Sequence, residues 1–302
     1  PVVAIPGGQV RAAIGASYRG QRALQVQSAG CPTCSFYQIV RDDDINRGVN
    51  AVFAEAVIPL VSGFNAKPGI EEFTVSLAGR YDNYDGLAGE FNPKVGFTWV
   101  PFTDLAVNAS WGTSFVAPNL GLITSIFGVP QPNISDRDAE GRQQQYDIYN
   151  LGGGNPDLGS EEAESSSVGF TYTPEFLEGL SLGVTHYRVE YSNLIYKPTR
   201  ADVLRNPAFS DSLILGNVDP VTGRIAPLPQ SFVDAAIAMA PPQTPILAGQ
   251  TFNMMFNSFA INVGTRIHAG YDFNIGYEFD SSIGQWDLGI VANQQTRYDE
   301  EV

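Results

Sequence analysis

The sequence predicts an all-β protein, an antiparallel portion of a transmembrane β-barrel, with about nine long strands in an open, curved sheet. Three observations lead to this prediction. Apolar and polar residues alternate over long stretches, the connections between these stretches are short on one side and mostly long on the other, and charged residues in the cleanest stretches keep to one face. Alternation with a period of two is the pattern of a β-strand.

The clearest alternation covers residues 261–279, where the apolar side chains occupy the odd positions and the even positions are polar or glycine. As one continuous strand, this stretch would span roughly 60 Å. Shorter stretches with the same pattern are 10–18, 73–82, 94–99, 105–115, 168–172 and 286–292. Two further strands are expected at 47–60 and 180–195, where the apolar side chains change face midway. A β-bulge or an exit from the apolar band would explain the change.

The connections between these strands fall into two classes. Those at 62–69, 101–104, 174–179 and 280–284 are short, whereas three of the four on the other side are long, at 27–46, 117–161 and 197–255. Short turns on the periplasmic side and longer loops outside are expected of an outer-membrane barrel. The aromatic residues beside the short turns fit an interfacial girdle; they are Trp99, Phe102, Phe176 and Trp286.

Composition narrows the classes of partner. The 302 residues carry a net charge of −15, which argues against a nucleic-acid partner. Only 16% of the residues are charged, against about 25% in a globular domain. A Lys or Arg facing lipid at mid-depth costs about 2–4 kcal/mol. The polar faces are therefore expected to line a lumen, with the residues Arg80, Asn108, Arg266 and Asp272; a soluble β-sandwich is disfavoured by the strand lengths.

Few residues suggest metal or catalytic chemistry. For Cys31 and Cys34 in a CPTC segment, a short loop disulfide is favoured over free thiols, a zinc half-site or a redox pair. His186 and Glu190 would lie about 13 Å apart on one strand, too far to share a metal ion. The acidic run 42–44 is expected to be a solvated loop rather than a calcium site. No catalytic residue, metal or cofactor is expected, and the chain is not predicted to be an enzyme.

Two loop segments have simpler interpretations. Residues 217–225 are expected to form a hairpin within a loop, because Asp219, Pro220 and Gly223 are turn formers. The GGGN run at 152–155 lacks the strand-to-helix context of a phosphate loop, so it is expected to be a flexible connection.

Two longer segments resemble a known family. Residues 92–120, NPKVGFTWVPFTDLAVNASWGTSFVAPNL, resemble the barrel hairpin of TonB-dependent outer-membrane receptors, with its NPK–G–W–P strand and its G-T-S-F-x-A-P-x-L ending. Residues 152–195 resemble the segment that follows, which begins N-P-x-L-x-x-E; Asn155, Pro156, Leu158 and Glu161 match. The family often has Lys-Pro-Glu where this chain has Gly-Ser-Glu at 159–161.

This resemblance implies a barrel of about 22 strands with an N-terminal plug. Residues 1–302 would then be a partial TonB-dependent receptor β-barrel domain, with the plug, the TonB-contacting box and the signal peptide outside the fragment. With two unpaired edges, the nine-stranded sheet is not expected to be stable alone.

The function implied by the resemblance is TonB-dependent uptake of a scarce solute, such as a siderophore, cobalamin or an oligosaccharide, across the bacterial cell outer membrane. TonB, outer-membrane lipid and the small-molecule or oligosaccharide ligand would be the partners. The alternative is a passive porin. The long loops would supply ligand contacts, with Arg142, Tyr146, Tyr149 and Asn150 as the best candidates. For these four residues the competing interpretation is that they only pack within the loops. For the four lumen residues the competing interpretation is contact with the plug instead of a ligand.

Overall fold

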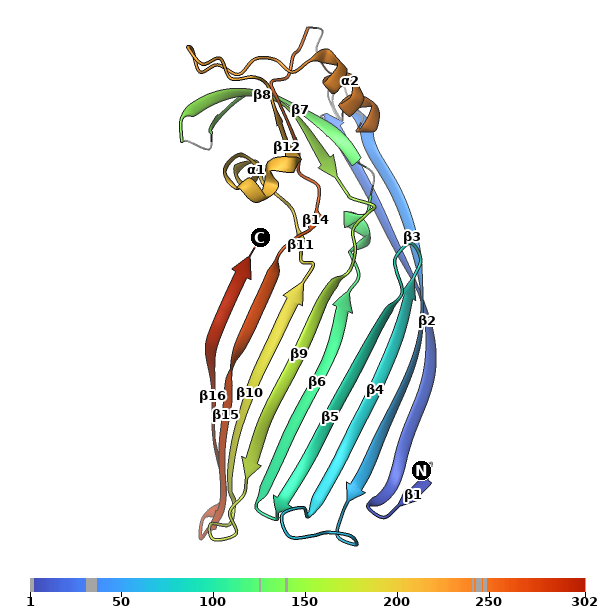
Figure 1. The fold of residues 1–302 in the computed structure, drawn as a ribbon, viewed down its shortest axis with the longest axis vertical. Helices are drawn as coiled ribbons and strands as arrows, with labels where there is room; N and C mark the ends of the chain where they lie inside the picture. Colours follow the sequence, from blue (N-terminus) through green and yellow to red (C-terminus); the bar gives the residue numbers. More distant parts are fainter. Residues whose placement is uncertain are drawn as a thin grey trace.

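The computed structural model describes residues 3–30, 37–124, 126–138, 141–240, 242, 246 and 249–301, and its main feature is one large curved sheet (Figure 1). The strand order β1-β2-β3-β4-β5-β6-β9-β10-β15-β16 contains ten strands among the described residues, each antiparallel to its neighbours. The strands are β1 Val3–Ile5, β2 Gly8–Gly30, β3 Tyr37–Val61, β4 Glu72–Tyr84, β5 Glu90–Phe102, β6 Leu105–Val116, β9 Glu161–Tyr172, β10 Leu180–Ser192, β15 Thr265–Ser281 and β16 Gly284–Glu301. The nine long strands and the open, curved sheet predicted from the sequence are confirmed.

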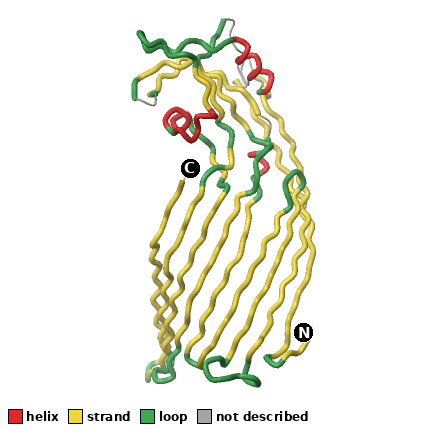
Figure 2. The backbone as a smooth tube through the Cα atoms, in the orientation of Figure 1, coloured by secondary structure: helices red, strands yellow, loops and turns green. Residues whose placement is uncertain are grey.

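Short turns join the strands at one end of the sheet and the longer segments gather at the other end (Figure 2). Trp99, Phe102, Phe176 and Trp286 all belong to the short-turn end and remain between 37% and 81% exposed. The Trp99 indole N–H donates to the carbonyl oxygen of Gly69 over 3.0 Å. An exposed aromatic row next to the turns is the arrangement expected of a girdle at a membrane interface. Among the described residues, no helix is both long and apolar enough to cross a membrane.

Three sequence predictions about element bounds are wrong. Residues 27–30 and 37–46 are not loop, because β2 and β3 extend through them as a long paired ribbon. The expected nineteen-residue strand is broken at Gly264, where φ is 93°, into β14 (Ile261–Asn262) and β15. Gly152 and Gly153 belong to β8 (Gln143–Gly153) and pair with Phe127 and Ile126.

The change of face along β10 has a simple explanation. The register of β10 with both β9 and β15 is unbroken from Leu182 to Tyr191, so there is no bulge. Tyr187, Val189 and Tyr191 therefore lie on the opposite face from Leu182 and Val184. The strand stays regular while its residues leave the apolar band, which was one of the two explanations left open by the sequence.

The two longest connections are not simple loops, as the sequence analysis assumed, but fold together into a second unit, which we call the loop layer. Its four-stranded sheet has the order β12-β13-β8-β7, with β13 parallel to β8. The loop layer comprises β7 Ile126–Arg137, β8, α1 Arg200–Arg205, the 3₁₀ helix η2 Pro207–Ser212, β12 Leu213–Leu215, α2 Gln230–Met239 and β13 Met254–Asn257.

Helices cover this small sheet on both faces, so β8 is buried on both sides. Tyr146 and Ile148 pack toward α1 and η2, in a cluster with Val203, Leu204, Phe209, Met254 and Phe256. Tyr149 and Leu151 point the other way and pack toward α2, with Leu228, Val233, Ala236, Ala240, Phe252 and Met255. The loop layer therefore has a hydrophobic core of its own. The expected hairpin at 217–225 is present within it, closed by the bridge between Val218 and Ile225.

A short ribbon connects the loop layer to the large sheet. In it β11 (Ile195–Tyr196) pairs with β14. The ribbon changes direction where it leaves β10 and β15, at Asn193 with φ 54° and at Gly264, both in the left-handed region. The backbone N–H of Val263 donates to the carbonyl oxygen of Leu194 over 2.8 Å, which keeps the two chains paired through the bend.

Candidate functional site

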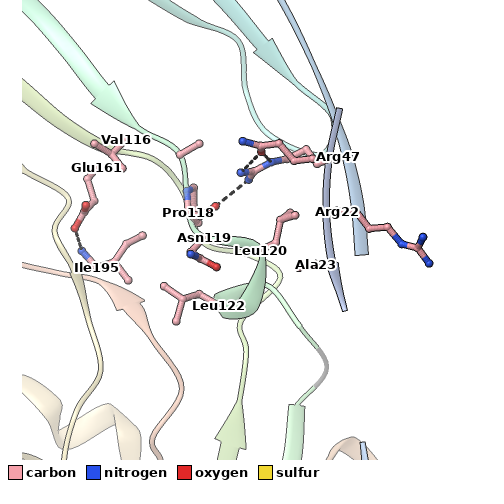
Figure 3. A pocket seen from close by; sticks show the side chains of 12 residues that line it. Arg22, Ala23, Arg47, Val116, Pro118, Asn119, Leu120, Leu122, Glu161 and Ile195 are labelled. Carbon is pink, nitrogen blue, oxygen red and sulfur yellow. Dashed lines mark hydrogen bonds between the residues drawn. The ribbon is translucent and has the colours of Figure 1, made fainter. Parts of the chain in front are cut away.

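A pocket lies at the end of the large sheet from which the connections to the loop layer depart (Figure 3). It encloses about 820 Å³ and is lined from three directions. Gln21 and Arg47 come from β2 and β3, and Glu161 and Ile195 from the starts of β9 and β11. The third side is formed by Val116 at the end of β6 and by Ala117, Pro118, Asn119, Leu120 and Leu122 from the segment that follows it. Both segments that carried the family resemblance therefore meet at this pocket.

Arg47 forms the wall on the β3 side, although its side chain is a cation and the residue is only 5% exposed. Its Nε and Nη2 donate to the amide oxygen of Gln21, at 3.0 and 2.8 Å, and its Nη1 donates to the carbonyl oxygen of Pro118 at 2.9 Å. The guanidinium carbon lies 5.0 Å from the ring centroid of Tyr84. The planar fork of an arginine suits this set of neutral acceptors and an aromatic face. Arg47 therefore attaches the segment after β6 to the sheet.

The segment held by Arg47 forms a tight turn. Asn119 caps the 3₁₀ helix η1 (Leu120–Leu122), because its side-chain oxygen accepts from the backbone N–H of Gly121 at 2.8 Å. The Leu120 side chain is buried. The carbonyl oxygen of Leu122 accepts from the backbone N–H of Asn155 at 2.6 Å, so the turn is bonded directly to the NPDL segment.

The NPDL segment makes further contacts with the connecting ribbon. The Asn155 side chain donates to the carbonyl oxygen of Ala260 at 3.0 Å, and Leu158 is buried. The side chain of Asn262 accepts from the N–H of Gly159 and donates to its carbonyl oxygen, at 2.8 and 3.0 Å. The Glu161 carboxylate accepts from the backbone N–H of Ile195 at 2.7 Å (Figure 3). Asn155, Leu158 and Glu161, the residues that match the family segment, therefore each have a structural role here: two form hydrogen bonds to neighbouring segments and one is buried.

The pocket presents cationic, amide and carboxylate side chains, and most of their hydrogen bonds are made to neighbouring protein groups. Such groups hold the surrounding segments in place and suit the binding of a ligand. Among the described residues no group of three or more His, Cys, Asp or Glu side chains could hold a metal ion.

The four residues expected to line a lumen share one face of the large sheet. Cross-strand pairing places Asn108, Gly169, Thr185 and Asp272 in a single row. Arg80 and Arg266 lie in other rows, each an even number of positions away along a paired strand, so their side chains point to the same face. We call this the polar face. It also carries Gln21, Arg47 and Glu161, so the pocket opens on it.

Each of these four residues has a partner on the polar face. Arg80 pairs with Asp82 at 2.8 Å and Arg266 with Glu300 at 2.9 Å. The Asn108 side chain accepts from the Thr98 hydroxyl at 2.8 Å, and Asp272 accepts from the Asn293 amide at 2.7 Å. The wall is therefore a network of short hydrogen bonds rather than a row of free charges.

The four expected ligand contacts do not converge on one site. Arg142 is exposed and pairs with Asp138 at 2.7 Å, directly before the first residue of β8. Tyr146 and Tyr149 are buried in the two cores of the loop layer, at 1% and 0% exposure, and burial raises the pKa of each phenol to about 12. Asn150 is half-buried. In this conformation the two tyrosines pack in the hydrophobic cores. Loop packing was the alternative to ligand contact in the sequence analysis.

Sequence reasoning missed Arg47, Gln21 and Asn262. Arg47 is the first residue of the expected strand 47–60, in which the apolar side chains change face midway, so its place on the polar face was hidden. Cys31 and Cys34 lie outside the described residues. Asp44, from the acidic run, forms an exposed ion pair with Arg22 at 2.7 Å.

The fold and this site together define the wall of a β-barrel with a folded loop layer at the end opposite the short turns (Figure 2). The sequence matches the family model "TonB dependent receptor-like, beta-barrel" over residues 5–302, and the chain belongs to that family. The family is one of transport receptors of the bacterial outer membrane. No protein of curated function matches the sequence.

Three solved structures with similar folds are receptors by their descriptions. The siderophore receptor PirA from Pseudomonas aeruginosa has a TM-score of 0.51 at 14% identity, over 95% of this chain and 39% of that one. The ferric enterobactin receptor PfeA from the same organism, in complex with enterobactin, has a TM-score of 0.55 at 15% identity, over 96% and 34%. PirA from Acinetobacter baumannii has a TM-score of 0.50 at 12% identity, over 84% and 28%. At these identities the likeness is one of fold, and this chain spans about a third of their length.

Proposed function

We propose that this chain forms part of the barrel wall and outer loops of an active transport receptor. The receptor takes up a scarce solute across the outer membrane with energy supplied through TonB. The observation that carries this proposal is the pocket described above, because hydrogen bonds of both segments that resemble the family hold together the connections that lead from the large sheet into the loop layer. A wall built to hold a large ordered loop layer is suited to capturing a ligand before transport.

In this proposal the polar face lines the lumen and the opposite face, with its exposed aromatic and aliphatic side chains, meets lipid. Arg80, Asn108, Arg266 and Asp272 would then line the transport path or contact the plug. The remaining barrel strands, the plug and the TonB-contacting segment would belong to the longer protein. A passive porin, the alternative function, is not supported by the family match.

The ligand class proposed first is a ferric siderophore, because similar folds occur in a siderophore receptor and in a ferric enterobactin receptor. Cobalamin and oligosaccharides remain the competing solutes. In the loop layer, Arg142 is the exposed cation of the four candidates, so it is the residue we propose for ligand contact, with the half-buried Asn150 second.

The test is uptake by cells that make the full-length protein. Labelled ferric siderophores, cobalamin and an oligosaccharide are supplied with and without a protonophore that collapses the proton gradient. Accumulation of one class that stops with the protonophore supports active transport and identifies the solute. Flux that continues unchanged and depends only on solute size would instead indicate a porin. A strain lacking TonB is the matched control for energy coupling.

A further inference from the structure

Arg47 is a buried cation that has no carboxylate partner among the described residues. It is 5% exposed, and its hydrogen bonds go to neutral oxygen atoms, those of the Gln21 amide and the Pro118 carbonyl. Burying a charge is costly unless an opposite charge lies beside it. On the same face of the sheet, the more exposed Arg80 does have such a partner, Asp82, at 2.8 Å. An anion would therefore stabilise Arg47.

A second arginine, which has no ion pair in the described part of the chain either, lies next to Arg47. Arg19 of β2 pairs across the strands with Val49, two residues beyond Arg47 on β3, so the two arginines are diagonal neighbours about 7 Å apart. Arg19 donates to the Tyr84 hydroxyl at 3.3 Å, and the guanidinium of Arg47 lies 5.0 Å from the centre of the same ring. Two cations this close repel each other, which favours an anion between them.

Arg47 has donors left for such an anion. Each of its two terminal nitrogens, Nη1 and Nη2, carries a pair of N–H groups, and one of each pair makes a hydrogen bond. A carboxylate can accept from two guanidinium N–H groups at once. Figure 3 shows the guanidinium pointing from β3 toward Pro118, and Glu161 on the other side of the pocket. Because the Glu161 carboxylate repels an anion, the side with Arg47 is the one that attracts it.

The same guanidinium holds residues 117–122, which we call the strap, against the sheet. The hydrogen bond from Nη1 of Arg47 to the Pro118 carbonyl oxygen, at 2.9 Å, joins the strap to β3. The strap leads from β6 toward β7, the first strand of the loop layer. A carboxylate attracts a guanidinium more strongly than a neutral carbonyl does, because opposite charges add to the hydrogen bond. A carboxylate in the pocket therefore competes with Pro118 for Arg47.

We propose that Arg47 and Arg19 bind the carboxylate of a small molecule in this pocket, and that binding releases the strap from β3. The pocket encloses about 820 Å³, which is the size of a small-molecule site and more than one side chain fills. Release of the strap alters the connection into β7, so the loop layer responds to the occupied pocket. The inference rests on the proposed function, because the small molecule is the transported solute.

The experiment uses the full-length protein in detergent, with acetate as the probe and acetamide as its neutral counterpart of the same shape. Chloride keeps the ionic strength equal. Binding is measured by NMR of the probe, and release of the strap by hydrogen exchange of residues 119–122. We expect acetate alone to bind and to speed this exchange. Arg19→Gln should weaken acetate binding about tenfold. Arg188→Gln is the matched control, because Arg188 forms an exposed ion pair on the opposite face.

The proposal is overturned if acetate and acetamide act alike on the unchanged protein, a comparison that needs no variant to fold. It is also overturned if acetate binds without speeding exchange of the strap, or if Arg19→Gln binds acetate as tightly as Arg188→Gln does. A structure of the full-length protein with one of its own carboxylates within about 4 Å of Arg47 would overturn it as well. Uptake that is independent of TonB, with the acetate effect intact, contradicts the proposed function alone.

Discussion

Arg47 donates a hydrogen bond from Nη1 to the carbonyl oxygen of Pro118 over 2.9 Å, although the two residues are 71 positions apart in the sequence. This bond joins β3 to the segment after β6, at the junction with the loop layer. The same guanidinium binds Gln21 twice and lies against the Tyr84 ring. One buried side chain therefore fixes two strands and a loop.

Replacing Arg47 is expected to loosen this junction. Arg47→Gln removes the bond to Pro118 and leaves a buried carbonyl oxygen without its donor, which costs about 1–3 kcal/mol. Hydrogen exchange of residues 117–122 in the full-length protein should become faster. The control is Arg11→Gln, which should leave exchange unchanged. Arg11 is an exposed arginine of β2 that lies on the polar face, as Arg47 does on β3. Equal exchange in the two variants would contradict the role given to Arg47.

The two buried tyrosines of β8 provide a matched pair. The Tyr149 hydroxyl donates to the carbonyl oxygen of Ala240 at 2.6 Å, whereas the Tyr146 hydroxyl has no hydrogen-bond partner among the described residues. Tyr149→Phe should destabilise the loop layer by about 1–2 kcal/mol, and Tyr146→Phe should be neutral or stabilising. Limited proteolysis of the loop layer across a denaturant series measures both, and the reverse order would contradict the structure.

Acidification is expected to release α1 from β7. Asp136 pairs with Arg200 at 2.7 Å and with Arg205 at 3.0 Å, and the hydrogen bond from Arg200 holds the pKa of Asp136 below its ordinary value. A lowered carboxyl pKa gives stability that is present above about pH 4 and is lost as the pH falls through the folded pKa. Hydrogen exchange of α1, corrected for intrinsic rates, should rise only below about pH 4.

A second carboxylate contributes to the same response. Asp202 accepts hydrogen bonds at the start of α1 from Thr199, which lowers its pKa as well. Asp136→Asn should therefore weaken the pH response, and the double variant with Asp202→Asn should remove it. If hydrogen exchange of α1 still rises below about pH 4 in the double variant, groups other than Asp136 and Asp202 cause the pH response.

The bend at Gly264 should not tolerate a side chain. With φ at 93°, Gly264→Ala forces an L-residue into a strained backbone region at a cost of about 1 kcal/mol or more. We expect faster proteolysis of the ribbon between the large sheet and the loop layer. Gly20→Ala is the control, since a Cβ there would meet nothing within 4 Å. Similar proteolysis of the two variants would show that the bend tolerates other conformations.

The assignment of the two faces can be tested by labelling. Single cysteines at Asn274 and Ile275 would lie on the polar and apolar faces of β15, one residue apart. In cells with the full-length protein, a water-soluble maleimide should label Asn274→Cys and spare Ile275→Cys, while a lipid-soluble reagent should do the reverse. Equal labelling by the soluble reagent would mean that both faces meet water.

Several features of this protein follow from its sequence alone. The period-two alternation gives the long strands and their two faces, because side chains on a strand point alternately to opposite sides. The shared face of Arg80, Asn108, Arg266 and Asp272 follows for the same reason. The short turns could be placed as well, because their proline, glycine and aspartate residues end each alternating run.

Tertiary structure decided the rest, because it depends on contacts between distant segments. The parallel pairing of β8 with β13 joins residues more than 100 positions apart, so the loop layer had no local signal. Tyr146 and Tyr149 were predicted to contact a ligand but are buried. The sequence could not separate the two roles, because an aromatic side chain is equally suited to a ligand site and to a hydrophobic core. The face of Arg297 depends on a bulge of one residue, and register of this kind is set by the neighbouring strand.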